Sequence, residues 1–147
     1  MDQLFFEPGW KPTPKPELAK RVAAAISEDG GVFDGNNSGT LQMRLEKAHS
    51  LIWLDLPLWI TFPRIIRRLV RNYGTVRPDM ADGCPERFDM EFLRWAWTFP
   101  QHSRPRQEIE FEAFGKMKYR LASKRDISRF LRRIERTGTT WDAVEPK

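Results

Sequence analysis

The sequence predicts an α/β protein in which strands alternate with helices around a parallel sheet. Short apolar runs at 31–35 and 50–55 each end in or before a polar turn, residues 117–121 alternate between apolar and polar, and helical patterns separate the three. Strands separated by helices favour a parallel sheet, because the chain must cross over before it can run again in the same direction. Two of the runs end in aspartate. We therefore expect the polar chemistry at the carboxyl ends of the strands, where open parallel sheets bind ligands.

The other elements follow from local patterns. Residues 1–16 contain four of the eleven prolines, which predicts an extended loop. Apolar residues at helical spacing predict helices at 17–27, 40–48, 58–73, 89–99 (ended by Pro100) and 104–114, and a last helix from the Ser123–Asp126 capping pair to Gly138. The segment from Gly74 to Phe88 holds two glycines and two prolines. A loop of that length inside a domain is typical of a functional lid or of disorder.

Composition narrows the class without choosing a partner. Twenty-five Lys and Arg against twenty Asp and Glu give a net charge of +5, which favours nucleotides, nucleic acid or acidic surfaces equally. A single cysteine, Cys84, excludes an internal disulfide framework and fits a reducing compartment. No apolar run approaches the roughly 20 residues of a membrane span. We expect a cytoplasmic protein with no membrane partner.

The stretch from Ser50 to Gly74 is the most informative part of the chain. An apolar run stops at Asp55, a turn follows at Pro57, and a helix then carries apolar residues on one face and arginines on the other; these are Arg64, Arg67, Arg68 and Arg71. A guanidinium group engages two phosphate oxygens at once and stays charged, so it suits a multiply charged anion. The alternative is that these arginines only solvate the helix.

Four strings together resemble one known family. They are FFEPGW, VFDGN, LIWLDLP and RPDMADGCPERFDMEFLRWAWTF. The sequence resembles the adenylate-kinase-like P-loop family often labelled DNA topology modulation protein, over roughly residues 1 to 135. The resemblance implies a three-layer P-loop kinase-like fold with a parallel sheet. It also implies transfer of the ATP phosphoryl group, with Mg²⁺, to a small-molecule acceptor.

One family feature is missing from this sequence. Members carry a strand, a GxxxxGK[ST] phosphate loop and a helix before the segment that begins here at Asp2, and no such motif occurs in the chain. We therefore expect an N-terminally truncated kinase-like domain at 1–137 that lacks its central first strand, with a lid at about 74–100 and a flexible tail at 138–147. Without the phosphate loop, we expect no appreciable turnover and a loosely held sheet unless its strands re-pair.

The resemblance also implies roles for individual residues. It assigns Arg64 and Arg68 to the transferred phosphoryl group, Arg77 and Arg87 to phosphate binding by the lid, Asp2, Trp10 and Asn36 to the acceptor pocket, and Asp34 to Mg²⁺ through a water molecule. Each has a plainer alternative: a solvated helix face for the arginines of the helix, an ordinary surface loop for those of the lid, and a turn cap for Asp34. Cys84 makes no zinc-site spacing with His49 or His102.

A different class of function stays open beside the kinase. The isoelectric point near 9.7 and the basic helices at 64–71 and 124–136 favour a nucleic-acid-binding or regulatory protein. The basic residues are spread over several elements, and none of them forms a known recognition-helix motif.

Overall fold

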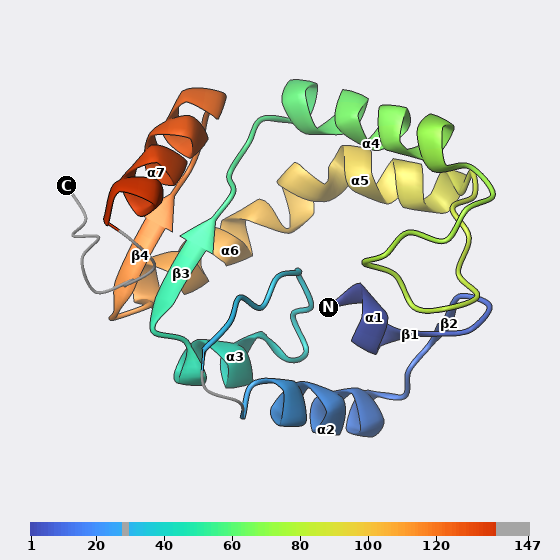
Figure 1. Cartoon of the computed structure of the whole chain (residues 1–147), viewed down its shortest axis with the longest axis horizontal. Helices are drawn as coiled ribbons and strands as arrows, with labels where there is room; N and C mark the ends of the chain where they lie inside the picture. The colour runs from blue at the N-terminus through green and yellow to red at the C-terminus, as the bar shows by residue number, and fades with distance from the viewer. Residues whose placement is uncertain (28–29, 138–147) are drawn as a thin grey trace. The chain divides into compact units, whose positions relative to one another are not determined.

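The described part of the chain alternates helices with short strands. The computed structural model describes residues 1–27 and 30–137. The helices are α1 (Asp2–Phe5), α2 (Lys15–Ala25), α3 (Leu41–Lys47), α4 (Leu58–Asn72), α5 (Met90–His102), α6 (Arg104–Ala113) and α7 (Lys124–Thr137). The strands are β1 (Phe6–Glu7), β2 (Lys11–Pro12), β3 (Ser50–Trp53) and β4 (Met117–Arg120) (Figure 1). The chain is therefore mixed α/β.

These residues divide into two compact units. Unit 1 combines residues 1–47 with 67–88, and unit 2 combines residues 48–66 with 89–137. Helix α4 contributes to both, since its first nine residues belong to unit 2 and its last six to unit 1. The predicted lid is divided as well: 74–88 lies in unit 1, and the part that includes α5 lies in unit 2. The predicted tail at 138–147 lies outside the described residues.

Unit 2 is built on a parallel pair of strands. Ser50 lies opposite Met117, and Trp53 lies opposite Arg120. Both strands therefore end at the same edge of the pair, and Asp55 follows β3 there. The predicted parallel pairing is confirmed for these two strands. A three-layer P-loop fold stays a prediction.

The predicted strand at 31–35 is wrong. Residues 31–37 form neither helix nor strand, and Val32 is 76% exposed. A strand needs a neighbour for its backbone N–H and C=O groups, and no described segment pairs with this one. Gly31 and Gly35 have φ angles of +100° and +115°, a backbone conformation typical of glycine in loops.

The N-terminal segment also differs from the predicted extended loop. Asp2–Phe5 form one helical turn, and β1 and β2 pair antiparallel. The first proline is Pro8, so the N–H groups that close this turn are present: those of Leu4 and Phe5 donate to the Met1 carbonyl at 2.9 and 3.0 Å. Proline therefore limits only the second half of the segment.

Two helices contain an internal proline. Helix α5 continues through Pro100 to His102, whereas the sequence predicted an end at Pro100. Proline removes one N–H donor, so α5 gives up the single hydrogen bond that residue 100 would donate one turn back. Helix α4 contains Pro63 in the same way and still begins at Leu58. Asp89 caps α5 by accepting the Phe92 N–H at 3.0 Å.

Each unit has a small core. In unit 1 the buried apolar side chains are Leu18, Val22, Leu69, Met80 and Cys84, and in unit 2 they are Ala96, Phe111, Phe114 and Leu121. Leu69 belongs to α4 and Met80 to the 74–88 loop, so that loop is packed into unit 1. Among the described residues, no helix is both long enough and apolar enough to cross a lipid bilayer.

Candidate functional site

Unit 1 holds every candidate residue named from the sequence except Arg64. These residues come from four places in the chain: the N-terminal segment, the loop at 34–37, the end of α4 and the 74–88 loop. Arg64 lies on α4 within unit 2, exposed and without an ion pair to a described residue. The contacts within unit 1 decide which of the others can act together.

Two of the predicted phosphate-binding arginines meet at one buried carboxylate, Glu86. The Nε atom of Arg77 lies 2.6 Å from Glu86 Oε1, and the Nε atom of Arg68 lies 3.4 Å from the same oxygen. The side chain of Glu86 is 4% exposed, that of Arg77 13% and that of Arg68 36%. Arg77 also donates to Asp79 Oδ2 at 2.9 Å. We call Arg68, Arg77 and Glu86 the Glu86 cluster.

The backbone fixes the carboxylate next to the end of α4. The Glu86 N–H donates to the Thr75 carbonyl, and the Gly74 N–H donates to the Glu86 carbonyl, both at 2.9 Å. Gly74 has φ +75°, the left-handed conformation that commonly ends a helix and that glycine adopts without strain. The 74–88 loop thus leaves the end of α4 and returns to it. This return places Glu86 within ion-pair distance of Arg68.

Polar atoms at the centre of the cluster lack hydrogen bonds although the charges are close. The Nε atoms of Arg68 and Arg77 and the Oε1 atom of Glu86 are buried, and none has a hydrogen-bond partner among the described residues. Buried polar groups nearly always have a partner, so unsatisfied groups gathered at one place need an explanation. The ion pairs supply that explanation here, because both Nε atoms lie within ion-pair distance of Glu86 Oε1.

Trp10 and Arg87 form a second contact between the same two segments. The Arg87 guanidinium lies 5.4 Å from the centre of the Trp10 ring. The Trp10 indole N–H donates to the Pro85 carbonyl at 3.0 Å, and its backbone N–H donates to Cys84 Sγ at 3.4 Å. Trp10 is the one non-glycine residue with a positive φ, 64°, in the described chain. Strain of this kind persists only where surrounding contacts enforce it, and it often marks functional sites.

The other candidates are more isolated. Asp34 is 93% exposed, and its Oδ1 lies 3.6 Å from the Met1 amino group. Asp2 and Asn36 are exposed, and neither side chain forms a hydrogen bond or ion pair with a described residue. The loop that carries Asp34 and Asn36 is held by Arg44, which donates to the carbonyls of Gly35 at 2.8 Å and Asn37 at 2.9 Å. Burial lowers the pKa of Arg44, and the charge of Asp34 partly opposes this shift.

The protein groups of this unit could supply only some of the ligands of a Mg²⁺ ion. No group of three His, Cys, Asp or Glu side chains in the described residues is arranged to hold a metal ion. Mg²⁺ in nucleotide sites uses one or two carboxylates and takes its other ligands from phosphate and water. Asp34, being exposed, has the ligand type for that role.

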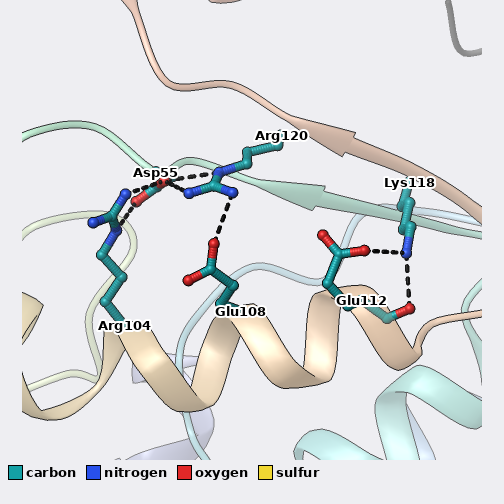
Figure 2. Close-up of polar contacts among 6 residues, drawn as sticks. All are labelled: Asp55, Arg104, Glu108, Glu112, Lys118 and Arg120. Carbon is teal, nitrogen blue, oxygen red and sulfur yellow. Dashed lines mark hydrogen bonds and ion pairs between the residues drawn. The ribbon is translucent and has the colours of Figure 1, made fainter.

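Unit 2 contains an ion-pair network centred on Asp55 (Figure 2). Arg104 donates to both carboxylate oxygens at 2.8 and 2.9 Å, and Arg120 donates twice to Oδ2 at 2.7 and 2.9 Å. Arg120 also donates to Glu108 and lies over the Trp53 ring, 4.6 Å from its centre. Figure 2 shows the neighbouring Lys118–Glu112 pair on the same side of α6.

The positive and negative charges of this network are equal in number, so we assign it a role in holding the fold together. Burial alone raises the pKa of Asp55, but the hydrogen bonds and positive charges of Arg104 and Arg120 outweigh burial and hold that pKa below its ordinary value. Two guanidinium groups face two carboxylates, those of Asp55 and Glu108. The network therefore joins β3, β4 and α6 and leaves little charge for a phosphate.

The sequence pointed to Arg68 and Arg77 but not to the carboxylate between them. Glu86 lies in the GCPE string, and nothing in the local sequence indicated that it would contact these two arginines. Arg44 gave no signal, because it continues an ordinary helical pattern. Comparison with known proteins adds no further assignment: no family model, curated protein or solved structure matches this chain.

Proposed function

We propose that this chain binds the phosphate groups of a nucleotide at the Glu86 cluster, as part of an adenylate-kinase-like phosphoryl-transfer site. One observation carries the proposal: Arg68 and Arg77, assigned to phosphate from different segments of the sequence, lie at a single buried carboxylate. Phosphoryl transfer depends chiefly on positioning and charge neutralisation, which pre-oriented arginines supply. ATP, when bound, would supply the phosphoryl group, and Mg²⁺ would neutralise part of its charge.

The residues of unit 1 divide the work by their chemistry. Glu86 holds the guanidinium groups of Arg68 and Arg77 in place, so binding costs less side-chain entropy than it would with free arginines. Arg68 is the more exposed of the two and is the first to meet a ligand. Arg87 is already held over Trp10, and we propose that this pair closes the lid edge of the site.

Replacement of Arg68 by glutamine tests the proposal. We expect Arg68→Gln to weaken binding of Mg·ATP about tenfold or more in isothermal titration calorimetry, since hydrogen bonds to charged groups contribute roughly 1.5–3 kcal/mol. The fold should survive, because Glu86 keeps Arg77 as its partner. Arg94→Gln is the matched control, since it removes the same charge from an exposed position on α5. Equal losses in the two variants, or no ATP binding by the unmodified chain, would refute the proposal.

A second candidate function, nucleic-acid binding, is favoured by the geometry of α7. Four exposed arginines recur there at helical spacing: Arg125, Arg129, Arg132 and Arg136. They fall within about 60° of one another around the helix axis and extend over about 16 Å. None forms an ion pair with a described residue. We call these four residues the arginine ridge.

The ridge points away from the apolar face of its own helix. Phe130 contacts Tyr119 of β4 at 5.0 Å between ring centres, and Ile127 and Ile134 lie on the same face. Like charges three and four residues apart destabilise a helix by about 0.2–0.5 kcal/mol per pair, a cost that a polyanion would remove. A membrane surface is disfavoured, because an interfacial helix must insert its apolar face, and here Phe130 of that face packs on Tyr119 of β4.

The ridge predicts a measurable salt dependence. We expect the chain to bind duplex DNA of arbitrary sequence, with the double variant Arg129→Gln/Arg132→Gln reducing the slope of log affinity against log salt by about 2. Lys15→Gln/Lys20→Gln on α2 is the matched control, with the same change in net charge. Fluorescence anisotropy over a salt series measures both. Identical slopes for the two double variants, or binding to anionic vesicles alone, would exclude this function.

A further inference from the structure

A groove of about 540 Å³ opens in unit 1 between the N-terminal segment, α2 and the 74–88 loop. Its lining includes Gln3, Phe6, Glu7, Arg21, Met80 and Asp82. The volume suits a small organic molecule. Met80 and Phe6 contribute apolar atoms to this lining, and the other four residues named are polar or charged.

The one arginine of the groove is already committed to protein partners. Each guanidinium nitrogen of Arg21 donates a hydrogen bond: Nε to Glu17 at 3.2 Å, Nη1 to Thr13 at 3.3 Å and Nη2 to Glu7 at 3.4 Å. Two carboxylates thus more than offset its single positive charge. The groove therefore offers little to an anionic ligand, although the protein as a whole is basic.

The carboxylates of the groove form fewer ion pairs with described residues than its arginine does. Asp82 is exposed and forms no ion pair with a described residue. The Glu7 side chain is 40% exposed, and its one ion pair, to Arg21, is long at 3.4 Å. The lining thus carries more negative than positive charge and includes the aromatic side chain of Phe6, and both features favour a cation.

We propose that this groove binds a small organic cation, an ammonium group on a compact apolar or aromatic skeleton. The inference rests on the proposed function in one respect, because it identifies this cation as the phosphoryl acceptor, which must then carry a hydroxyl group besides its ammonium group. The hydroxyl oxygen would form the new bond to the γ-phosphorus of ATP as the bond from that phosphorus to the bridging oxygen breaks, so that ADP leaves and the hydroxyl proton passes to water. The 74–88 loop carries both sites: Met80 and Asp82 line the groove, and Arg77 and Glu86 belong to the Glu86 cluster. The two sites differ in charge as an acceptor site and a phosphate site should.

Three probes of similar shape and different charge test the groove: phenethylamine, phenethyl alcohol and phenylacetate. We expect phenethylamine to bind most tightly and phenylacetate most weakly when nitrogen–proton correlation spectra of the full chain are titrated with each. The amide signals of Ala81, Asp82 and Gly83 should shift with the amine. Asp82→Asn should weaken amine binding about two- to fivefold, as expected for one exposed ion pair, and leave the alcohol unchanged.

Glu91→Gln on α5 is the matched control, since it removes an exposed carboxylate from unit 2. Equal affinity for the amine and the carboxylate, or an equal effect of the two substitutions, would overturn the inference. The same measurements distinguish failure of this inference from failure of the proposed function. If the chain binds the amine but not ATP, the cation site in the groove is supported and the proposed phosphoryl-transfer function is refuted. If it binds ATP but does not prefer the amine, the proposed function is supported and the cation site is refuted.

Discussion

Replacing Glu86 by alanine should lower the free energy of unfolding by about 3 kcal/mol, the lower end of the range for breaking a buried ion pair. The change leaves Arg77, only 13% exposed, without the carboxylate 2.6 Å from its Nε. Arg68 loses the same partner. For a chain of this length, the loss corresponds to a fall in melting temperature of roughly 6–12 °C. Thermal unfolding followed by circular dichroism measures it.

Asp79→Ala is the matched control for Glu86→Ala. Asp79 also pairs with Arg77, at 2.9 Å, but its side chain is 64% exposed. Its removal should cost less than about 1 kcal/mol, because exposed ion pairs contribute little. Equal destabilisation by the two substitutions would show that burial does not set the importance of Glu86.

Replacing Asp55 by asparagine should destabilise the protein by about 2–3 kcal/mol near neutral pH, since hydrogen bonds from two guanidinium groups lose their charged acceptor. The Asp55 side chain is 7% exposed, so solvent replaces little of what is lost. Glu108→Gln is the control: Glu108 accepts from Arg120 in the same network, but its side chain is 47% exposed. We expect it to cost less than about 1 kcal/mol.

The same substitution predicts a pH dependence with a definite sign. The pKa of Asp55 is lower in the folded protein than its ordinary value. Its stabilising contribution is therefore complete above the unfolded pKa of about 3.9 and is lost as the pH falls through the folded pKa. In urea titrations, the stability difference between the unmodified chain and Asp55→Asn should be constant from about pH 7 to pH 5 and shrink below about pH 4. A difference that grows on acidification would contradict this assignment.

Local patterns in the sequence predicted most helices and the two strands that pair in parallel. Helix α7 follows from its capping pair, in which the Asp126 N–H donates to Ser123 Oγ at 3.1 Å. The strand predicted at 31–35 failed because an apolar run becomes a strand only when a neighbour supplies hydrogen bonds. Helix α5 continues past Pro100 to His102, and the proline removes one N–H donor from it.

The sequence predicted the arginines of the candidate site but not Glu86, the carboxylate between them. Arg68 and Arg77 stood out as charges near a proline turn and a long loop. Their meeting at Glu86 depends on the path of the 74–88 loop, which returns to α4 through backbone hydrogen bonds between Thr75, Gly74 and Glu86. No local pattern encodes that return. Arg44 and the Asp55 network were missed for the same reason, since their partners lie on other elements.

The phosphate claim is tested most directly by measuring how affinity depends on the number of phosphate groups. The ligands are adenosine, AMP, ADP and ATP, each titrated with Mg²⁺ into the unmodified chain and into Arg68→Gln. We predict that affinity rises with each added phosphate in the unmodified chain and that Arg68→Gln removes most of that rise without changing the affinity for adenosine. Equal affinity for adenosine and ATP, or the same rise in both proteins, would contradict a phosphate site at the Glu86 cluster.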